Sequence, residues 1–354
     1  MSEISVIGLD LAKNVFQVHC LDADERIVLK RKLRRYEVEV FFKKLAPCLV
    51  GMEACGGAHH WARLLRSHGH DVRLLPPSYV KAYVRRGKTD AADAAAIAEA
   101  VTRPSMRFVG IKEAEQQGVL VKHSVRDLLI RQKTMLINAL RGHLSEFGLV
   151  SAQGRGGLQQ LRSLLSDAPA NLPASALKAL QGIERMIETL LEEISGFEKQ
   201  LRDECRRSEK CRRLMSIPGI GPICASYIAT NAPDLSQFST GRDFAAWAGL
   251  TPKAHSSGGK DRVGKISKQG DMTLRRLLVT GATTIVLLAG RGKARRKGAL
   301  MDWISRLLEK GKPFKMVAVA LANKMARIIW ALMTQNTFYT ASADNEPLSS
   351  LQES

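Results

Sequence analysis

The sequence predicts an α/β domain at the N-terminus, then a helical coiled-coil segment and a mainly α C-terminal domain. Short β-branched segments fill the first 75 residues, amphipathic helical repeats run from 112 to 212, and a helix-rich, basic stretch follows from 214. A chain of 354 residues exceeds one typical core, so several domains are expected. Their predicted bounds are 1–108, 109–212 and 213–335, and a polar tail, 336–354, is expected to be disordered.

The N-terminal segments follow the order of a mixed sheet. Three strands are expected in succession, at 4–10, 15–21 and 26–32. Helices and strands then alternate: helix 36–46, strand 48–53, helix 58–68, strand 71–75, and helices 78–84 and 90–102. This order predicts an antiparallel meander of three strands, extended by parallel βα units.

The middle of the chain predicts two long helices. Leucines near whole-turn spacing predict a helix from 112 to about 147, and apolar residues at coiled-coil positions predict another from about 175 to 212. A loop near 150–172 separates them, so we expect an antiparallel helical hairpin or coiled coil. These apolar stripes indicate a core or a dimer seam and imply no cofactor.

The charge balance indicates a polyanionic partner. Lys and Arg outnumber Asp and Glu by 54 to 34, a net charge of +20, and nucleic acid is the default partner of such a field. The longest apolar run, 277–290, has 14 residues, so we expect a core helix and no membrane span. Six scattered cysteines without a C-x-x-C motif favour reduced thiols over a zinc site.

Two carboxylates end predicted strands, Asp10 in "IGLDLAKN" and Glu53 in "LVGMEACGG". Each could mark a turn, because Asp and Glu are common there, or could serve a site. Asp90 and Asp93, in "KTDAADA", share one helix face at a spacing of three. They could also be a helix start, since carboxylates in a first turn are favoured by the helix dipole.

Taken together, these four carboxylates predict a metal site. Adjacent strands can hold two of them side by side, and a helix packed on the sheet can bring the other two against them. Converging carboxylates repel one another unless divalent cations neutralise them, and Mg²⁺ prefers oxygen ligands. One or two such ions would support phosphodiester displacement. Arg85, Arg86 and Lys88, directly before the helix, are expected to hold a nucleic-acid backbone.

The stretch "LMSIPGIGPICASYIAT", 214–230, predicts two helices separated by a break at 218–221. We interpret it as a helix-hairpin-helix, in which the backbone at Gly219 and Gly221 contacts a phosphate. A simple helical turn is the alternative.

A second candidate lies in "KAHSSGGKDRVGKISKQGD", where Ser256 and Ser257 precede two glycines. Ser and Gly clusters are usually flexible loops. An exposed serine in a positive field can also attack phosphorus, given a base, a metal or stabilising cations. His255 is not assigned as that base. The surrounding cations are expected to bind nucleic acid: Lys253, Lys260, Arg262, Lys265 and Lys268.

The ordered set of strand–Asp, strand–Glu and helix D-x-x-D resembles the RuvC-like branch of the ribonuclease H fold over about residues 1–105. Nearly the full chain resembles the DEDD-type insertion-sequence transposases of the insertion sequence one-ten family. That resemblance is carried by "GLDLAKN", "MEACGG", "KTDAADA", "IPGIG", "FAAWAGLTP", "HSSGGK" and "ISKQGD". "HSSGGK" is similar to the branch that contains the Coxiella-type elements.

The resemblance implies a cytoplasmic, nucleoid-associated bacterial enzyme that excises and inserts its own element. The four carboxylates would be the Mg²⁺ ligands, and Ser257 would form a covalent phosphoserine link to DNA, with Ser256 still open. Implied partners are double-stranded DNA at element ends and target, a noncoding bridge RNA, and further copies of the chain. The copies would form a dimer or tetramer in which different subunits complete each site.

Three other functions stay open at this point. One is a site-specific DNA invertase with the same chemistry. Another is a RuvC-like structure-selective endonuclease, in which the carboxylates direct water and the serine is irrelevant. The third is a nucleic-acid-binding protein without activity, which the intact carboxylates disfavour.

Overall fold

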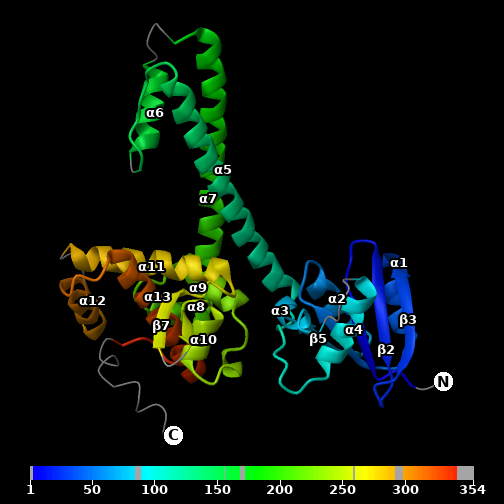
Figure 1. The fold of residues 1–354 in the computed structure, drawn as a ribbon. Coiled ribbons are helices and arrows are strands. Elements are labelled where there is room, and N and C mark those ends of the chain that lie inside the picture. Colours follow the sequence, from blue (N-terminus) through cyan, green and yellow to red (C-terminus); the bar gives the residue numbers. More distant parts are fainter. Residues whose placement is uncertain are drawn as a thin grey trace. The chain divides into compact units, whose positions relative to one another are not determined.

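The computed structural model describes residues 3–83, 89–154, 156–167, 172–257, 260–291 and 298–340. The chain divides into two compact units, Met1–Gly118 and Val119–Ser354 (Figure 1). The predicted tail therefore lies largely outside the described residues, and the predicted division of residues 109–335 into two domains stays a prediction.

The first unit is built on a five-stranded mixed sheet in the order β3-β2-β1-β4-β5 (Figure 1, blue to cyan). The strands are β1 (Val6–Asp10), β2 (Val15–Leu21), β3 (Ile27–Arg34), β4 (Leu49–Glu53) and β5 (Asp71–Leu75). Strands β1, β2 and β3 pair antiparallel, while β4 pairs parallel to both β1 and β5. The predicted meander with parallel βα extensions is confirmed.

Helices cover both faces of this sheet. On one face, α1 (Arg35–Lys43) and α2 (Ala58–Ser67) share a buried core with the strands, in which Phe16 packs edge-on against Trp61. On the other face, α3 (Pro77–Val80) and α4 (Asp90–Val101) form a smaller cluster around Leu75 and Ile97. The helix expected at 78–84 is a single turn, and residue 84 lies outside the described range.

The second unit contains two long antiparallel helices. Helix α5 (Ala114–Ser145), whose first residues belong to the first unit, lies beside α7 (Ala174–Arg207) in Figure 1. Lys122 pairs with Glu204, and farther along the helices Leu140 shares a buried cluster with Ile187. This pairing of early with late residues makes the expected antiparallel hairpin.

The loop expected near 150–172 is not wholly a loop. It contains α6 (Gly157–Ser166), and its Leu161 and Leu165 are buried in the same cluster as the hairpin. The segment "GLQQLRSLLS" repeats leucine at helical spacing, but its polar and glycine-rich flanks hide that period. Burial of the leucine stripe stabilises a helix that the flanks alone would not predict.

The rest of the second unit is mainly helical. Its elements are α8 (Glu209–Met215), α9 (Pro222–Asn231), η1 (Leu235–Gln237), α10 (Gly241–Trp247), β6 (Pro252–Ser257), β7 (Lys260–Ile266), α11 (Met272–Gly290), α12 (Ala299–Glu309) and α13 (Phe314–Gln335). Fully buried side chains such as Phe244, Leu278 and Ile329 form one core.

Two of these helices, α11 and α13, are long and apolar enough to cross a membrane by length and composition. Both also supply the core of the second unit, through residues such as Ala282 and Leu321. The apolar run 277–290 is therefore part of a core helix, but only one face is buried, since Leu287 and Leu288 are 42% and 39% exposed.

Candidate functional site

Two predicted site residues end neighbouring parallel strands. Gly8 pairs with Gly51 and Leu9 with Met52, so the next register step brings Asp10 of β1 beside Glu53 of β4. Alternate residues of a strand share one face. Each carboxylate therefore lies on the face of the glycine two residues before it.

These glycines explain how α4 packs close to the strand ends that carry Asp10 and Glu53. A Cβ at Gly8 would overlap the carbonyl oxygen of Ala94, and a Cβ at Gly51 would lie 2.8 Å from Cβ of Val101. Because neither glycine has a side chain, α4 packs directly onto β1 and β4. The repeated spacing G-x-D and G-x-E in "GLD" and "GME" is a sequence signal for this close packing that was not recognised among the predictions above.

Asp90 and Asp93 stand in the first turn of α4. The hydroxyl of Thr89 caps this helix by accepting a hydrogen bond from the backbone N–H of Ala92, at 3.2 Å. The helix start supplies a favourable dipole for both carboxylates. The two interpretations of this pair, a helix start and a site, are thus compatible.

The four residues Asp10, Glu53, Asp90 and Asp93 are called the carboxylate set below. Burial raises the pKa of Asp10 to about 6, and the three other carboxylates of the set add to the shift. Electrostatically, then, the set acts as a group. Within the described residues, however, no three His, Cys, Asp or Glu side chains lie close enough together to hold a metal ion.

The other predicted contacts of the first unit cannot be placed. Arg85, Arg86 and Lys88 lie outside the described residues.

In the second unit, the predicted break between helices is present, because α8 ends at Met215 and α9 begins at Pro222. Gly219 has a φ of +87°, and a Cβ there would lie 3.1 Å from the carbonyl oxygen of Gly281 in α11. The left-handed backbone at position 219 and its close approach to α11 therefore both favour glycine. Gly221 is exposed, and a Cβ there would meet no atom within 4 Å. Gly221 is the better placed of the two for an external phosphate.

The serine segment is a β-hairpin where the sequence predicted a loop. Strands β6 and β7, the serine hairpin below, pair antiparallel, with Ser257 opposite Lys260 and Ser256 opposite Asp261. A composition rich in Ser, Gly and Lys hides the strands, because strand pairing, not local propensity, stabilises them. Gly258 and Gly259, which follow Ser257 in sequence, are outside the described residues.

Of the five predicted cations around the serines, Lys253, Lys265 and Lys268 are exposed. The other two, Lys260 and Arg262, are residues of β7. No ion pair involves these three exposed lysines within the described part of the chain, so their charge is available to a polyanion.

The base of the serine hairpin is held by residues that the sequence analysis did not single out. Arg275 donates hydrogen bonds to the carbonyl oxygens of Ala248 at 3.0 Å and Gln269 at 2.8 Å, which flank the hairpin in sequence. A Cβ at Gly249 would overlap the carbonyl oxygen of Gln269, and a Cβ at Gly270 would overlap the carbonyl oxygen of Trp247. Two glycines and one arginine thus fix the hairpin base.

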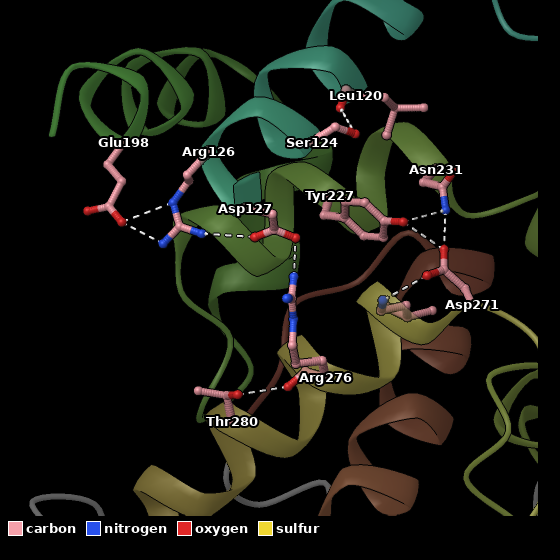
Figure 2. A network of polar contacts seen from close by, with 11 residues as sticks. Leu120, Ser124, Arg126, Asp127, Glu198, Tyr227, Asn231, Asp271, Arg276 and Thr280 are labelled. Carbon is pink, nitrogen blue, oxygen red and sulfur yellow. Dashed lines mark hydrogen bonds and ion pairs between the residues drawn. The ribbon is translucent and has the colours of Figure 1, made fainter. Parts of the chain in front are cut away.

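A polar network adjoins this base (Figure 2). Asp271 caps α11 by accepting from the N–H of Leu274 at 2.9 Å, and it also accepts from the hydroxyl of Tyr227 at 2.8 Å and from Asn231. Burial raises the pKa of Tyr227, and Asp271 adds to the shift. The start of α11 is therefore linked to α9 by hydrogen bonds.

A second set of polar contacts links α11 to α5. Asp127 pairs with Arg276 of α11 and with Arg126, and Arg126 pairs in turn with Glu198 of α7 (Figure 2). Successive residues of α11 thus hold two structures: Arg275 holds the serine hairpin, and Arg276 holds the helical hairpin.

Two family models match the chain. The DEDD model of IS110 transposases, described as a transposase, matches residues 7–148. A model described as the transposase IS116/IS110/IS902 family matches residues 211–297. The first match covers the carboxylate set and the second covers the serine hairpin.

Transposases of two other bacteria match over nearly the whole chain, and a gene-inverting protein matches over about a third of it. A probable family 20 transposase of Pseudomonas aeruginosa is 49% identical over 338 residues, 95% of this chain and 98% of the relative. The transposase for insertion sequence element IS1111A of Coxiella burnetii is 37% identical over 344 residues, 97% of this chain and 93% of the relative. A pilin gene-inverting protein of Moraxella bovis is 31% identical over 124 residues, 35% of this chain and 36% of the relative.

The ribonuclease H-like sheet, the carboxylate set and these matches define a DNA transposase, an enzyme of phosphoryl transfer. The chain belongs to the IS110, or insertion sequence one-ten, family, which confirms the resemblance predicted from its motifs. Transposase activity implies DNA binding, and a DEDD domain implies a divalent metal ion.

Proposed function

We propose that this transposase excises and inserts its own element by metal-dependent strand cleavage at the carboxylate set and strand exchange through a phosphoserine at Ser257. The observation that carries the proposal is the convergence of Asp10 and Glu53 with the helix that bears Asp90 and Asp93, through the close approach of α4 to Gly8 and Gly51. The charge of the chain supports a nucleic-acid substrate.

The carboxylate set fits Mg²⁺ in its chemistry. All of its donors are oxygens, which Mg²⁺ prefers, and burial, together with the charges of the three other carboxylates, raises the pKa of Asp10, a cost that a bound cation would offset. Bound ions would polarise the scissile phosphate and stabilise the leaving oxygen. Because no three donors are yet close enough to share an ion among the described residues, metal binding would draw the set together.

Serine chemistry would follow at the hairpin. The hydroxyl oxygen of Ser257 bonds to phosphorus, the bond from phosphorus to the leaving DNA oxygen breaks, and that oxygen takes up a proton. A second DNA oxygen then displaces the serine, which restores the hydroxyl. Exposed Lys253, Lys265 and Lys268 supply positive charge near the developing phosphorane.

Further contacts with DNA belong to the same proposal. Arg85, Arg86 and Lys88 would hold the backbone near the carboxylate set. The turn between α8 and α9 would act as a helix-hairpin-helix, mainly through Gly221. Lys260 and Arg262 would join the lysines of the serine hairpin. All of these contacts reach phosphates and so position DNA without reading its sequence.

Sequence choice would come from a bridge RNA that pairs with donor and target DNA. The protein would work in the bacterial cytoplasm, on nucleoid DNA, as a dimer or tetramer in which α5 and α7 form an oligomerising coiled coil. The carboxylate set and the serine of one site would come from different subunits.

A site-specific invertase is the second candidate. The partial match to a pilin gene-inverting protein favours it, since 31% identity over 124 residues shows that related segments occur in an inverting protein. Both candidates use the same cleavage chemistry and differ in the arrangement of the DNA ends.

The test compares Ser257→Ala, Ser256→Ala and Asp10→Ala in strand exchange with purified full-length protein, bridge RNA and Mg²⁺. We expect Ser257→Ala to abolish the covalent protein–DNA adduct and strand exchange, while Ser256→Ala retains the adduct. Full DNA cleavage by Ser257→Ala, with loss only in Asp10→Ala, would instead show the resolvase-like endonuclease. Exchange at the wild-type rate without RNA would disprove the guided mechanism.

A further inference from the structure

A groove of about 480 Å³ lies along α4, on the sheet face that also carries the carboxylate set. One wall is the helix, through Ala92, Ala95 and Ala96, and the other is formed by β2 and β3. The groove begins two residues after Asp90 and extends to Arg103, beyond the end of α4. It therefore leads away from the proposed cleavage site.

The strand wall contains two polar side chains that make no hydrogen bond to the described protein. His19 lines the groove and is only 7% exposed, and Gln17, two residues earlier on the same strand, is 8% exposed. Neither side chain makes a hydrogen bond within the described part of the chain. Neither side chain is among the buried polar groups that lack a partner, so the polar atoms of both reach solvent on this face, where a ligand in the groove can bond to them.

The strand register orders these groups relative to the carboxylates. Gln17 lies opposite Asp10 on one side and opposite Lys32 on the other, while His19 lies opposite Lys30. A row therefore crosses three strands, from a carboxylate through an amide to an ammonium group. Residues directly opposite each other share a face of the sheet.

The outer edge of this face carries two lysines, and of the two carboxylates that line the groove, Glu25 and Glu99, Glu99 pairs with Arg103. Lys30 lines the groove, Lys32 is its neighbour on the same face of β3, and both are exposed. Neither forms an ion pair with any described carboxylate. His19 is held neutral, since burial and the charge of Lys30 lower its pKa. A neutral imidazole offers one donor and one acceptor, the combination that a nucleobase edge can pair with.

We propose that this groove binds one unpaired nucleotide of the DNA strand that is cut, next to the phosphate held at the carboxylate set. The base lies between the alanines of α4 and β2, hydrogen-bonded by His19 and Gln17. The flanking phosphates lie on Lys30 and Lys32. This inference rests on the proposed function for the position of the scissile phosphate.

Size and chemistry favour this occupant. The groove volume falls in the range of small-ligand sites, which suits a single nucleotide. A paired base cannot enter between a helix and a sheet, so the nucleotide must be extruded or single-stranded. Tyr83, at the groove wall, adds an aromatic surface for the base.

Photo-crosslinking of full-length protein to single-stranded DNA that carries 4-thiothymidine tests this site. We expect crosslinks in the peptides that contain His19 and Tyr83, and little crosslinking with the same sequence as a duplex. Ala95→Phe, which fills the groove, should lower the yield about tenfold relative to total crosslinking. Lys30→Glu should lower it about fivefold, because one phosphate contact is replaced by repulsion.

The matched control is Lys43→Glu, which makes the same charge change at an exposed site of α1, on the opposite sheet face. It should leave the groove crosslinks unchanged. Unchanged crosslinks in both Ala95→Phe and Lys30→Glu would overturn the proposal. So would stronger crosslinking by RNA of the same sequence, which would assign the groove to the guide.

Failure here is distinguishable from failure of the proposed function. Crosslinking needs no cleavage and no serine adduct, so it reports the groove alone. If the groove variants bind like wild type while Asp10→Ala still abolishes cleavage, the proposed function stands and the groove site is wrong. If wild type crosslinks at the groove but never forms a serine adduct, the reverse holds.

Discussion

Gly8 of β1 lies against the backbone of α4 at Ala94, so closely that a Cβ would overlap the Ala94 carbonyl oxygen. Gly8→Ala must push α4 off the sheet. We expect this variant to lose about 3 kcal/mol of stability, as overpacked cores do, and to lose DNA cleavage, since Asp90 and Asp93 move with the helix. Thermal unfolding and a cleavage assay measure the two effects.

The control for this prediction is Gly110→Ala, in the same unit, where a Cβ would meet no atom within 4 Å. Gly110→Ala should unfold and cleave like wild type. Wild-type cleavage by Gly8→Ala would show that the position of α4 does not set activity.

Asp10 should destabilise the protein in the absence of metal. Because the pKa of Asp10 is raised from 3.8 to about 6, the folded state binds its proton more tightly than the unfolded state. The contribution of Asp10 to stability is therefore favourable at low pH and is lost as the pH rises from about 4 to 6. Asp10→Asn should raise metal-free stability at neutral pH by about 1 kcal/mol, discounted for partial exposure.

The same variant separates stability from metal binding. Mg²⁺ should raise the melting temperature of wild type but not of Asp10→Asn, which should also be inactive. The surface variant Asp24→Asn, a carboxylate paired only with exposed Arg26, serves as control and should behave like wild type. Equal stabilisation of wild type and Asp10→Asn by Mg²⁺ would contradict a role of Asp10 as ligand.

Asp271 should stabilise the second unit more than an ordinary helix cap does. It caps α11 and also accepts from Tyr227 and Asn231, so Asp271→Ala removes the acceptor of Leu274 and Tyr227, while Asn231 keeps its hydrogen bond to the Tyr227 hydroxyl. We expect a loss of about 3 kcal/mol in urea unfolding. Asp234→Ala, which removes an exposed cap of a short 3₁₀ turn, should cost about 1 kcal/mol or less.

A double-mutant cycle checks the partnership. Tyr227→Phe should cost about 1 kcal/mol in the wild-type background and clearly less beside Asp271→Ala, where only the hydrogen bond from Asn231 is left to lose. Additive costs would show that the two residues do not act together.

Arg275 should matter for strand exchange more than for folding. Its hydrogen bonds to Ala248 and Gln269 fix the base of the serine hairpin, so Arg275→Ala should loosen the position of Ser257. We expect strand exchange to fall at least about tenfold and stability to fall by about 1–2 kcal/mol. Exchange kinetics and unfolding are measured together.

Arg306→Ala is the matched control, since Arg306 is exposed on α12 and donates only to a carbonyl of its own helix. It should leave both quantities unchanged. If Arg275→Ala exchanges strands as fast as Arg306→Ala, the hydrogen bonds of Arg275 at the hairpin base do not affect strand exchange.

Local patterns were sufficient for the sheet and for the family. Short runs of β-branched and apolar residues bounded by turn residues predicted the five strands to within a few residues, and most residues of β1, β2 and β4 are indeed buried. Asp10, Glu53 and the pair at 90 and 93 stood out as carboxylates in apolar or alanine-rich context. Helix α6 and the serine hairpin were missed, because leucine burial and strand pairing stabilise them against their own polar, glycine-rich composition.

By itself, therefore, the sequence determined the order of elements, the family and the identity of the carboxylates. Only the tertiary structure decided that Gly8 and Gly51 admit α4 to the sheet, that Arg275 holds the serine hairpin, and that His19 lies unpaired in a groove. Each of these depends on atoms far apart in the chain, where steric fit and hydrogen-bond geometry act. No local pattern of residues encodes such distances.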